Sequence, residues 1–506
     1  MITIKKNNSF ISRRKNIFLI PIAILFVVWL LLYLPHLRTS PAWYGDETLI
    51  HHTSRNLASG IATNLSLWAT FWHPHYPYQP VYSFVNGIFA RMADGDIAGS
   101  RFFNAILALL CSLSLFLCGR KIFGLFPAFF SALMFLTYEQ SIIHFRMSYA
   151  HNAVGLGFLL MTLFLLRPAG KRNDWLAGIG LLIAAGSHPL FIHGVVTALL
   201  CRIKNPRSWI RLFFPSFIYM IVSLSVIYFL FGSWLIEDLH HLKNTYLSRG
   251  ASDGEGLKSL GNFLTFIFQD YYHVFMFFGL LLCLPLKRYA APIVGIIILF
   301  LLVRNRQNLI PFYYQSIIIL PVLCIGWAGL TRYIFNQIRR KLLHILWIRW
   351  AFFVFPAILF FIALPQSISG AFITRNHYWV TQSTSEVESA AKWINEHTKP
   401  TDIVAGNSNI AWLLHAETVP YLQLITYYGF TTQGYENGNK RERFRFNAAL
   451  ENCHYAVVGD IDQRWTFFEP NVAILTQIIS KEKWPVVWSG VNYFVLENPR
   501  FLKKDK

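Results

Sequence analysis

Charged residues are scarce in this sequence. Only 14% of its 506 residues are Asp, Glu, Lys or Arg, whereas 54% are hydrophobic and 17% are aromatic. An average soluble domain carries roughly 25% charged residues. A chain this poor in charge lacks the polar surface that water requires. The composition therefore excludes a soluble globular protein as the interpretation of the whole chain.

Acidic residues are the rarest charged class. The 25 Asp and Glu residues face 45 Lys and Arg residues, which gives a formal net charge of +20. This excess does not indicate a nucleic-acid partner, because the basic residues lie in short segments between apolar runs. Such a distribution is the positive-inside pattern that orients membrane helices. The clusters are Arg120–Lys121, Arg167–Arg172, Arg202–Arg211, Lys287–Arg288 and Arg339–Lys341.

Other features are missing as well. No Gly-rich phosphate loop precedes a predicted helix of the C-terminal part, which argues against nucleotide binding there. The six cysteines do not have the spacing of a disulfide framework. The His-x-His pair of His73 and His75 has no third metal ligand at a suitable spacing. The two halves show no internal symmetry, although many transporters do.

Long apolar runs dominate residues 17–366. A membrane-spanning helix needs roughly 20 apolar residues, and the runs predict about eleven spans. Basic residues precede the first run, and no small-residue cleavage site follows it, so we interpret it as a retained signal anchor. The predicted spans are 17–34, 101–119, 122–138, 149–166, 175–187, 189–201, 210–231, 263–284, 289–303, 312–333 and 350–366.

The stretch 175–201 offers two interpretations. One continuous helix would place Arg202 and Arg211 outside the cell, against the charge rule. Two short helices separated at Gly186-Ser187-His188-Pro189 would return them to the cytoplasm, and proline favours a break because it removes a backbone donor. We therefore predict a hairpin of two short helices.

This span count predicts a topology in the cytoplasmic (inner) membrane. With the N-terminus inside, the basic clusters face the cytoplasm, and residues 35–100 and 232–262 form long outer loops. Val81–Ala90 is too short to span and predicts a helix at the membrane interface. Gly250–Gly256 predicts a mobile flap. Residues 1–384 would form the transmembrane domain, and residues 385–506 a soluble domain outside the cell.

The C-terminal part has a different composition and alternates helix and strand patterns. Such alternation is typical of a small α/β domain. The fold class is therefore mainly α, a polytopic bundle of transmembrane helices with an extracytoplasmic α/β domain. Its expected elements are helices at 387–397 and 440–450 and strands at 402–406, 455–459, 486–488 and 493–496.

Two adjacent carboxylates follow the first span. Asp46 and Glu47 lie in the aromatic segment Pro41–Thr48. Carboxylates close to a membrane are costly unless they are paired or functional, so we take the pair as a candidate site. The alternative is that they are solvated loop charges.

Arginines are few on the predicted outer side and are therefore informative. They are Arg101, Arg146, Arg304 and Arg306. A guanidinium group can hold a lipid phosphate through two hydrogen bonds. Simple snorkelling towards lipid headgroups is the alternative.

An ordered set of motifs resembles a known family. The motifs are Asp46-Glu47-Thr48, Ser54-Arg55, Leu57–Gly60, His73-Pro74, Ser100-Arg101 and Gly119–Gly124. Together they resemble the protein mannosyltransferases and lipid A aminoarabinose transferases, which form glycosyltransferase family 39 and have the GT-C fold. The sequence departs from many relatives at one point. The Asp that they carry about five residues after the arginine matching Arg146 is replaced here by His151, followed by Asn152.

The resemblance implies a reaction. A polyprenyl-phosphate-linked sugar would be the donor, and a hydroxyl of a lipid, glycan or protein acceptor would attack its anomeric carbon with inversion. Asp46 would be the base, Glu47 would orient the acceptor or a cation, and the four arginines would hold the donor phosphate. The remaining candidates would line the substrate site: Arg55, His73, Tyr76, His151 and Asn152.

The resemblance implies no nucleotide outside the cell, and it leaves a divalent cation open. Membrane lipids would surround the spans. Other classes remain as alternatives: a lipid-linked glycan polymerase or ligase, a transporter or flippase, and a membrane-anchored binding protein.

Overall fold

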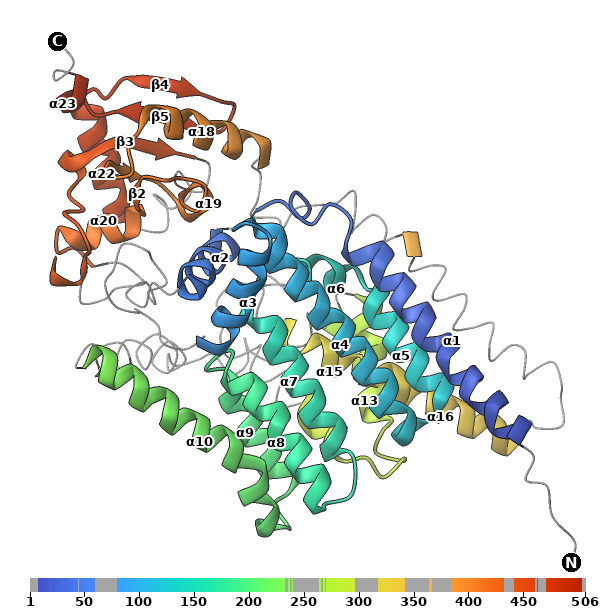
Figure 1. Cartoon of the computed structure of the whole chain (residues 1–506). Coiled ribbons are helices and arrows are strands. Elements are labelled where there is room, and N and C mark those ends of the chain that lie inside the picture. Colours follow the sequence, from blue (N-terminus) through green and yellow to red (C-terminus); the bar gives the residue numbers. More distant parts are fainter. Residues whose placement is uncertain are drawn as a thin grey trace, which may run out of the picture.

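A computed structural model gives the structure of the chain, which is mainly helical with one mixed sheet near the C-terminus (Figure 1). It describes residues 8–43, 45–59, 80–232, 235–236, 239, 264, 267–268, 270–295, 317–341, 364–365, 384–431, 441–459, 462 and 470–502. The predicted Gly250–Gly256 flap and the predicted span 350–366, apart from residues 364–365, lie outside these ranges.

Apolar helices occupy most predicted spans within the described ranges. Two of them, Ile97–Phe123 and Pro206–Phe229, are long and apolar enough to cross a membrane, and several others are apolar but shorter. The full set of eleven spans stays a prediction. The helices of this part are α1 (Asn8–Tyr33), α4 (Ile97–Phe123), α5 (Leu125–Thr137), α6 (Glu139–His144), α7 (Ala150–Leu165), α8 (Lys171–Ala185), α9 (Phe191–Cys201), α10 (Pro206–Phe231), α13 (Tyr271–Leu281), α15 (Leu320–Leu323) and α16 (Ile325–Lys341).

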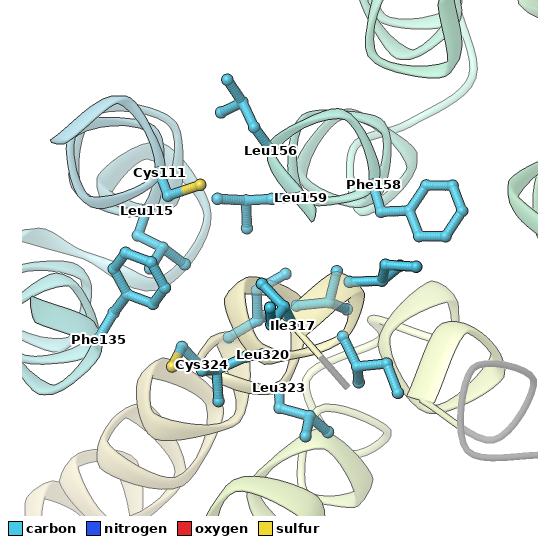
Figure 2. Close-up of a cluster of buried hydrophobic side chains, with 14 of the residues drawn as sticks. Cys111, Leu115, Phe135, Leu156, Phe158, Leu159, Ile317, Leu320, Leu323 and Cys324 are labelled. Carbon is cyan, nitrogen blue, oxygen red and sulfur yellow. The ribbon is translucent and has the colours of Figure 1, made fainter. Parts of the chain in front are cut away.

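The helical core forms where α4, α5, α7 and α15 meet. Figure 2 shows Cys111 and Leu115 of α4, Phe135 of α5 and Leu159 of α7 gathered around Leu320 of α15. Elsewhere, α13 and α16 touch backbone to backbone, since a Cβ on Gly326 would lie 1.8 Å from the carbonyl oxygen of Met276. Small residues at such crossings let helices pack closely where the hydrophobic effect between helices is weak.

The split of the stretch 175–201 is confirmed. Helix α8 ends at Ala185 and α9 begins at Phe191. The amide of Tyr82 donates a hydrogen bond of 3.3 Å to the carbonyl of Gly186 in the break. Tyr82 belongs to α3 (Pro80–Met92), which is the predicted interfacial helix.

Basic loops gather at one end of the bundle. Arg167 donates to the carbonyl of Cys118, Arg202 to that of Leu165 and Arg288 to that of Leu166. Buried Asp174 accepts from Arg202 at 3.1 Å and from Ser208 at 2.7 Å. Helix α4 has 27 residues, so this end lies about 40 Å along α4 from Ile97.

The C-terminal sheet has the strand order β2-β1-β3-β5-β4. Its members β1, β2 and β3 are mutually parallel, whereas β5 runs antiparallel to β3 and β4. The elements are α18 (Thr384–His397), β1 (Ile403–Ala405), α19 (Ser408–Ala411), β2 (Glu417–Val419), α20 (Tyr421–Tyr427), two short 3₁₀ turns (Arg441–Arg443 and Leu450–Asn452), β3 (Cys453–Val458), α22 (Pro470–Lys481), β4 (Val486–Ser489), β5 (Phe494–Glu497) and α23 (Pro499–Leu502).

One predicted element of this part is wrong. Residues 440–450 were expected to form a basic helix, but the described residues 441–450 form a 3₁₀ turn followed by irregular chain. Phe444 and Ala448 both enter the buried core, while Arg445 donates to Glu417 at 2.7 Å. These tertiary contacts hold the segment against the sheet and override its helical pattern. The sequence also missed β2 and α22.

The C-terminal sheet and its helices rest on residues 35–100, the first predicted outer loop. This loop contains α2 (Gly45–Ala58) and α3, which pack against each other above the bundle (Figure 1). Trp43 and Ile97 from the loop share a buried cluster with Val387, Ile410 and Trp412. The loop and the C-terminal domain therefore lie on the same side of the bundle, as the topology requires.

Candidate functional site

The acidic pair begins α2. Asp46 and Glu47 both lie in the first turn of this helix, where the partial positive charge of the helix N-terminus favours carboxylates. Consecutive side chains on a helix point about 100° apart. As a result Glu47 is fully buried, whereas Asp46 is only half-buried. The fold thus gives the two carboxylates different environments.

Glu47 forms a buried ion pair with Arg101 of α4. The two carboxylate oxygens accept hydrogen bonds of 2.7 Å each from Nε and Nη2 of Arg101, and both side chains are 0% exposed. The amide of Ser148 adds a third hydrogen bond to Glu47, of 2.9 Å. Bidentate, charge-assisted pairs of this kind are short and geometrically specific. The pair therefore joins α2, α4 and the segment before α7 at one point.

Arg101 and Arg146 are both buried, and both donate hydrogen bonds to the segment between α1 and α2. Nη1 of Arg101 donates to the carbonyl of Leu37 at 2.8 Å and to that of Pro41 at 2.7 Å. Arg146 donates to the carbonyl of Pro35. The family resemblance implied that Arg101 and Arg146 hold a donor phosphate, whereas in the structure both guanidinium groups donate to loop carbonyls.

A buried network of amides surrounds this ion pair. The side-chain oxygen of Asn104 accepts from the hydroxyl of Tyr82 at 3.1 Å and from the amide of Asn152 at 2.8 Å. Asn86 donates to the hydroxyl of Ser148 at 3.0 Å, whose own backbone amide reaches Glu47. Buried hydrogen bonds that are linked in this way favour a rigid site. Asn104 and Asn86 were not among the predicted site residues; the available signal was a polar amide inside the apolar span 101–119 for Asn104 and inside the predicted interfacial helix for Asn86.

His51 lies one turn after Glu47 on α2. Its Nε2 faces the carbonyl of Gly95 at 3.1 Å and must donate, so Nδ1 accepts from the hydroxyl of Ser100 at 2.8 Å. Burial, assisted by the nearby charge of Arg55, lowers the pKa of His51 to about 3. His51 is therefore a neutral structural link between α2 and α4.

The remaining predicted residues fall into two groups. Within the described ranges, Arg55 donates to the carbonyl of Trp412 at 3.0 Å, and His151 packs beside His188 with ring centres 4.6 Å apart. Asn152 joins the amide network above. The others lie outside the described residues: His73, Tyr76, Arg304 and Arg306.

A metal centre is not evident in the described part of the chain. No group of three His, Cys, Asp or Glu side chains among the described residues is placed to hold an ion. The described site is thus built from one buried ion pair, one accessible carboxylate and a network of amides. Of its two carboxylates, Asp46 is the one that keeps access to solvent, which a general base requires.

Comparison with known proteins gives a family match over part of the chain and a fold for nearly all of it. The model of the family described as dolichyl-phosphate-mannose-protein mannosyltransferase matches residues 73–231. The crystal structure of ArnT from Cupriavidus metallidurans bound to undecaprenyl phosphate is similar over 95% of this chain and 97% of that chain, with a TM-score of 0.61 and 15% identity. The chain has the GT-C glycosyltransferase fold. The resemblance predicted from the sequence is thereby confirmed, by the family match over residues 73–231 and by the fold.

A second solved structure agrees with this fold. The oligosaccharyltransferase of Archaeoglobus fulgidus matches over 94% of this chain and 73% of its own chain, with a TM-score of 0.54 and 13% identity. No curated protein sequence matches the chain. The family match begins at residue 73, so it includes Arg101, Arg146 and Asn152, while the acidic pair of α2 precedes it.

Proposed function

We propose that this protein of the GT-C fold moves a sugar from a polyprenyl-phosphate donor to an acceptor hydroxyl on the extracytoplasmic face, with inversion, and that Asp46 is the base. The observation that carries the proposal is the division of the acidic pair. Glu47 is sealed in an ion pair, whereas Asp46, its neighbour on the first turn of α2, keeps access to solvent. A base must reach the proton that it abstracts.

The reaction is a single displacement. The acceptor oxygen forms a bond to the anomeric carbon as the bond from that carbon to the phosphate oxygen breaks. The hydroxyl proton passes to Asp46, and the polyprenyl phosphate leaves with the bonding electrons. Its growing negative charge requires cationic groups nearby, and Arg304 and Arg306 are our candidates for this role. ArnT, the similar structure described above, was crystallised with undecaprenyl phosphate, which supports a carrier of this class.

Glu47 and Arg101 act in this proposal by holding the site in shape. Glu47 accepts three short hydrogen bonds inside the protein. Arg101 donates further hydrogen bonds to loop carbonyls. Both side chains are fully buried, so neither is placed to contact a substrate. Their effect on catalysis would come through the position of α2, and therefore of Asp46. This modifies the roles that the family resemblance implied for both residues.

We further propose the inner membrane as the location, with the N-terminus inside and the C-terminal domain outside. The gathering of basic loops at one end of the bundle supports this orientation, because such loops stay in the cytoplasm. The acidic pair then lies on the outer side, next to the C-terminal domain. A lipid-linked donor would reach it from the outer leaflet.

Turnover of defined donors by the purified protein tests the proposal. The full chain in lipid nanodiscs should release polyprenyl phosphate from a polyprenyl-phosphate sugar when an acceptor is added. Asp46→Asn keeps the shape of the side chain and should lower the rate about a hundred- to ten-thousandfold. Asp94→Asn is a matched control, because Asp94 is exposed in the turn after α3 and asparagine tolerates its positive φ of 52°. Full activity of Asp46→Asn would remove Asp46 from the mechanism, and absence of turnover across sugars and acceptors would remove the proposed reaction.

A further inference from the structure

The carboxyl edge of the C-terminal sheet faces the catalytic helix. Strands β1 and β3 are parallel neighbours, so the residues that follow them lie at the same edge of the sheet. Asn407 and helix α19 follow β1, and Gly459 follows β3. Helix α19 packs directly on α2. This edge therefore lies against the helix that carries Asp46.

A chain of hydrogen bonds connects α2 with this edge. The hydroxyl of Thr48 donates to the side-chain oxygen of Asn409 at 3.0 Å, and both residues are at most 1% exposed. The backbone amide of Asn409 donates to the side chain of Asn407 at 2.9 Å. Asn407 in turn donates to Asp462 at 2.8 Å, and Asp462 also accepts from the amide of Gly459. The connection thus runs without interruption from the first turn of α2 to the ends of β1 and β3.

Trp412 makes a second connection further along α2. Its ring packs edge to face against Trp43, with centres 5.0 Å apart, and against His51, with centres 5.1 Å apart. Its carbonyl accepts from Arg55 at 3.0 Å. Trp43 and Trp412 are 2% and 4% exposed. Aromatic pairs in this arrangement stabilise by about 0.5–1.5 kcal/mol beyond the area that they bury.

We infer that Asn409 and Trp412 are positioning residues, through which the C-terminal domain holds α2 and sets the place of Asp46. Helix α2 has only 14 residues, and helices of this length are marginal without tertiary contacts. Glu47 fixes one face of its first turn to α4, and Thr48, the next residue, fixes another face to the C-terminal domain. Asp46 precedes both, so its direction depends on both attachments. A shift of about 1 Å in such a group can lower a rate a hundredfold.

This inference rests on the proposed function, because turnover is one of its two readouts. The variants are Thr48→Val, which removes the hydroxyl at nearly constant shape, Asn409→Ala, and the double variant. Each single change should lower kcat about three- to tenfold, the range of one hydrogen bond, with KM for the donor within twofold. The double variant should be no slower than the slower single variant, because both remove the same contact. Thr48→Ser, which retains the hydroxyl, should restore kcat.

Hydrogen exchange supplies the readout that does not depend on activity. Amides of α2 should exchange at least threefold faster in Thr48→Val and Asn409→Ala than in the unaltered chain, while amides of α4 and of β3 stay protected. Asn471→Ala is the matched control, because Asn471 also donates a side-chain hydrogen bond, to the carbonyl of Thr431, but lies on α22. It should change neither kcat nor the exchange of α2.

The outcomes separate this inference from the proposed reaction. If the unaltered protein shows no turnover, the proposed reaction is wrong. Faster exchange of α2 amides in Thr48→Val and Asn409→Ala would still support the attachment of α2 to the C-terminal domain. Additive losses of kcat in the double variant, or unchanged exchange of α2 in Thr48→Val, would overturn the inference. If Asn409→Ala unfolds the sheet, β3 amides lose protection, and Thr48→Val then decides alone, because it leaves the C-terminal domain intact.

Discussion

Breaking the buried pair of Glu47 and Arg101 should destabilise the protein more than any change of an exposed charge. Glu47→Gln keeps the volume and removes the negative charge. Arg101 would then keep a buried positive charge without a partner. Of its two groups that now donate to Glu47, Nε and Nη2, one would face the amide NH₂ of the new side chain, which cannot accept a hydrogen bond. Removing one partner of a buried pair typically costs about 3–5 kcal/mol. The fully buried, bidentate geometry with 2.7 Å contacts places this pair in that class.

Thermal unfolding with a thiol-reactive dye can measure the effect. Cys111 and Cys324 are buried in the helical core (Figure 2) and become accessible only when the bundle opens. For a chain of 506 residues the midpoint shifts by about 1 °C per kcal/mol, so it should fall by roughly 3–5 °C. Glu388→Gln is the matched control, because Glu388 pairs with Arg38 at 2.7 Å but with side chains 36% and 50% exposed. Exposed pairs contribute about 0–1 kcal/mol, so its midpoint should move by at most about 1 °C.

A double variant tests the reasoning itself. Arg101→Met alone should also destabilise, since Glu47 would keep a buried charge without its partner. The combination of Glu47→Gln with Arg101→Met should be clearly less destabilised than the sum of the two, because no unpaired charge remains. Recovery would be incomplete, since the carbonyls of Leu37 and Pro41 lose their donor. Strict additivity, or a Glu47→Gln midpoint equal to that of Glu388→Gln, would refute the assignment of Glu47 to a structural ion pair.

Further measurements address the remaining features. Arg304→Gln and Arg306→Gln should each raise the donor concentration needed for half-maximal rate about ten- to a hundredfold, the value of a charge-assisted contact; unchanged donor dependence in both would mean that neither holds the phosphate. A single cysteine at Asn205 should resist an impermeant reagent added to intact cells, and its labelling would overturn the predicted topology. Burial raises the pKa of Asp462 to about 7, so the folded domain binds this proton more tightly than the unfolded chain does. The contribution of Asp462 to stability should therefore decrease by up to about 4 kcal/mol as the pH rises from 4 to 7; exchange of β3 amides should show this, and Asp462→Asn should abolish it.

Much of the fold was predictable because the membrane imposes simple rules. The apolar runs located α1, α4, α5, α7 and α10, since the length of a spanning helix is set by the bilayer. The charge rule predicted the break between α8 and α9, even though both helices are short. In the C-terminal domain, short buried strands were found from their β-branched runs. The segment 440–450 was missed because its local pattern favours a helix, while Phe444 and Ala448 are drawn into the core.

The sequence by itself determined the class of protein, the position of the acidic pair and the family resemblance, because these depend on composition, spacing and local motifs. It could not separate Asp46 from Glu47, which are adjacent and chemically alike. Only the tertiary structure brought Arg101, 54 residues away, onto Glu47, and Asn409, 361 residues from Thr48, onto the same turn of α2. Burial and partner choice depend on segments that meet in space, and no local pattern encodes which partners a side chain will meet.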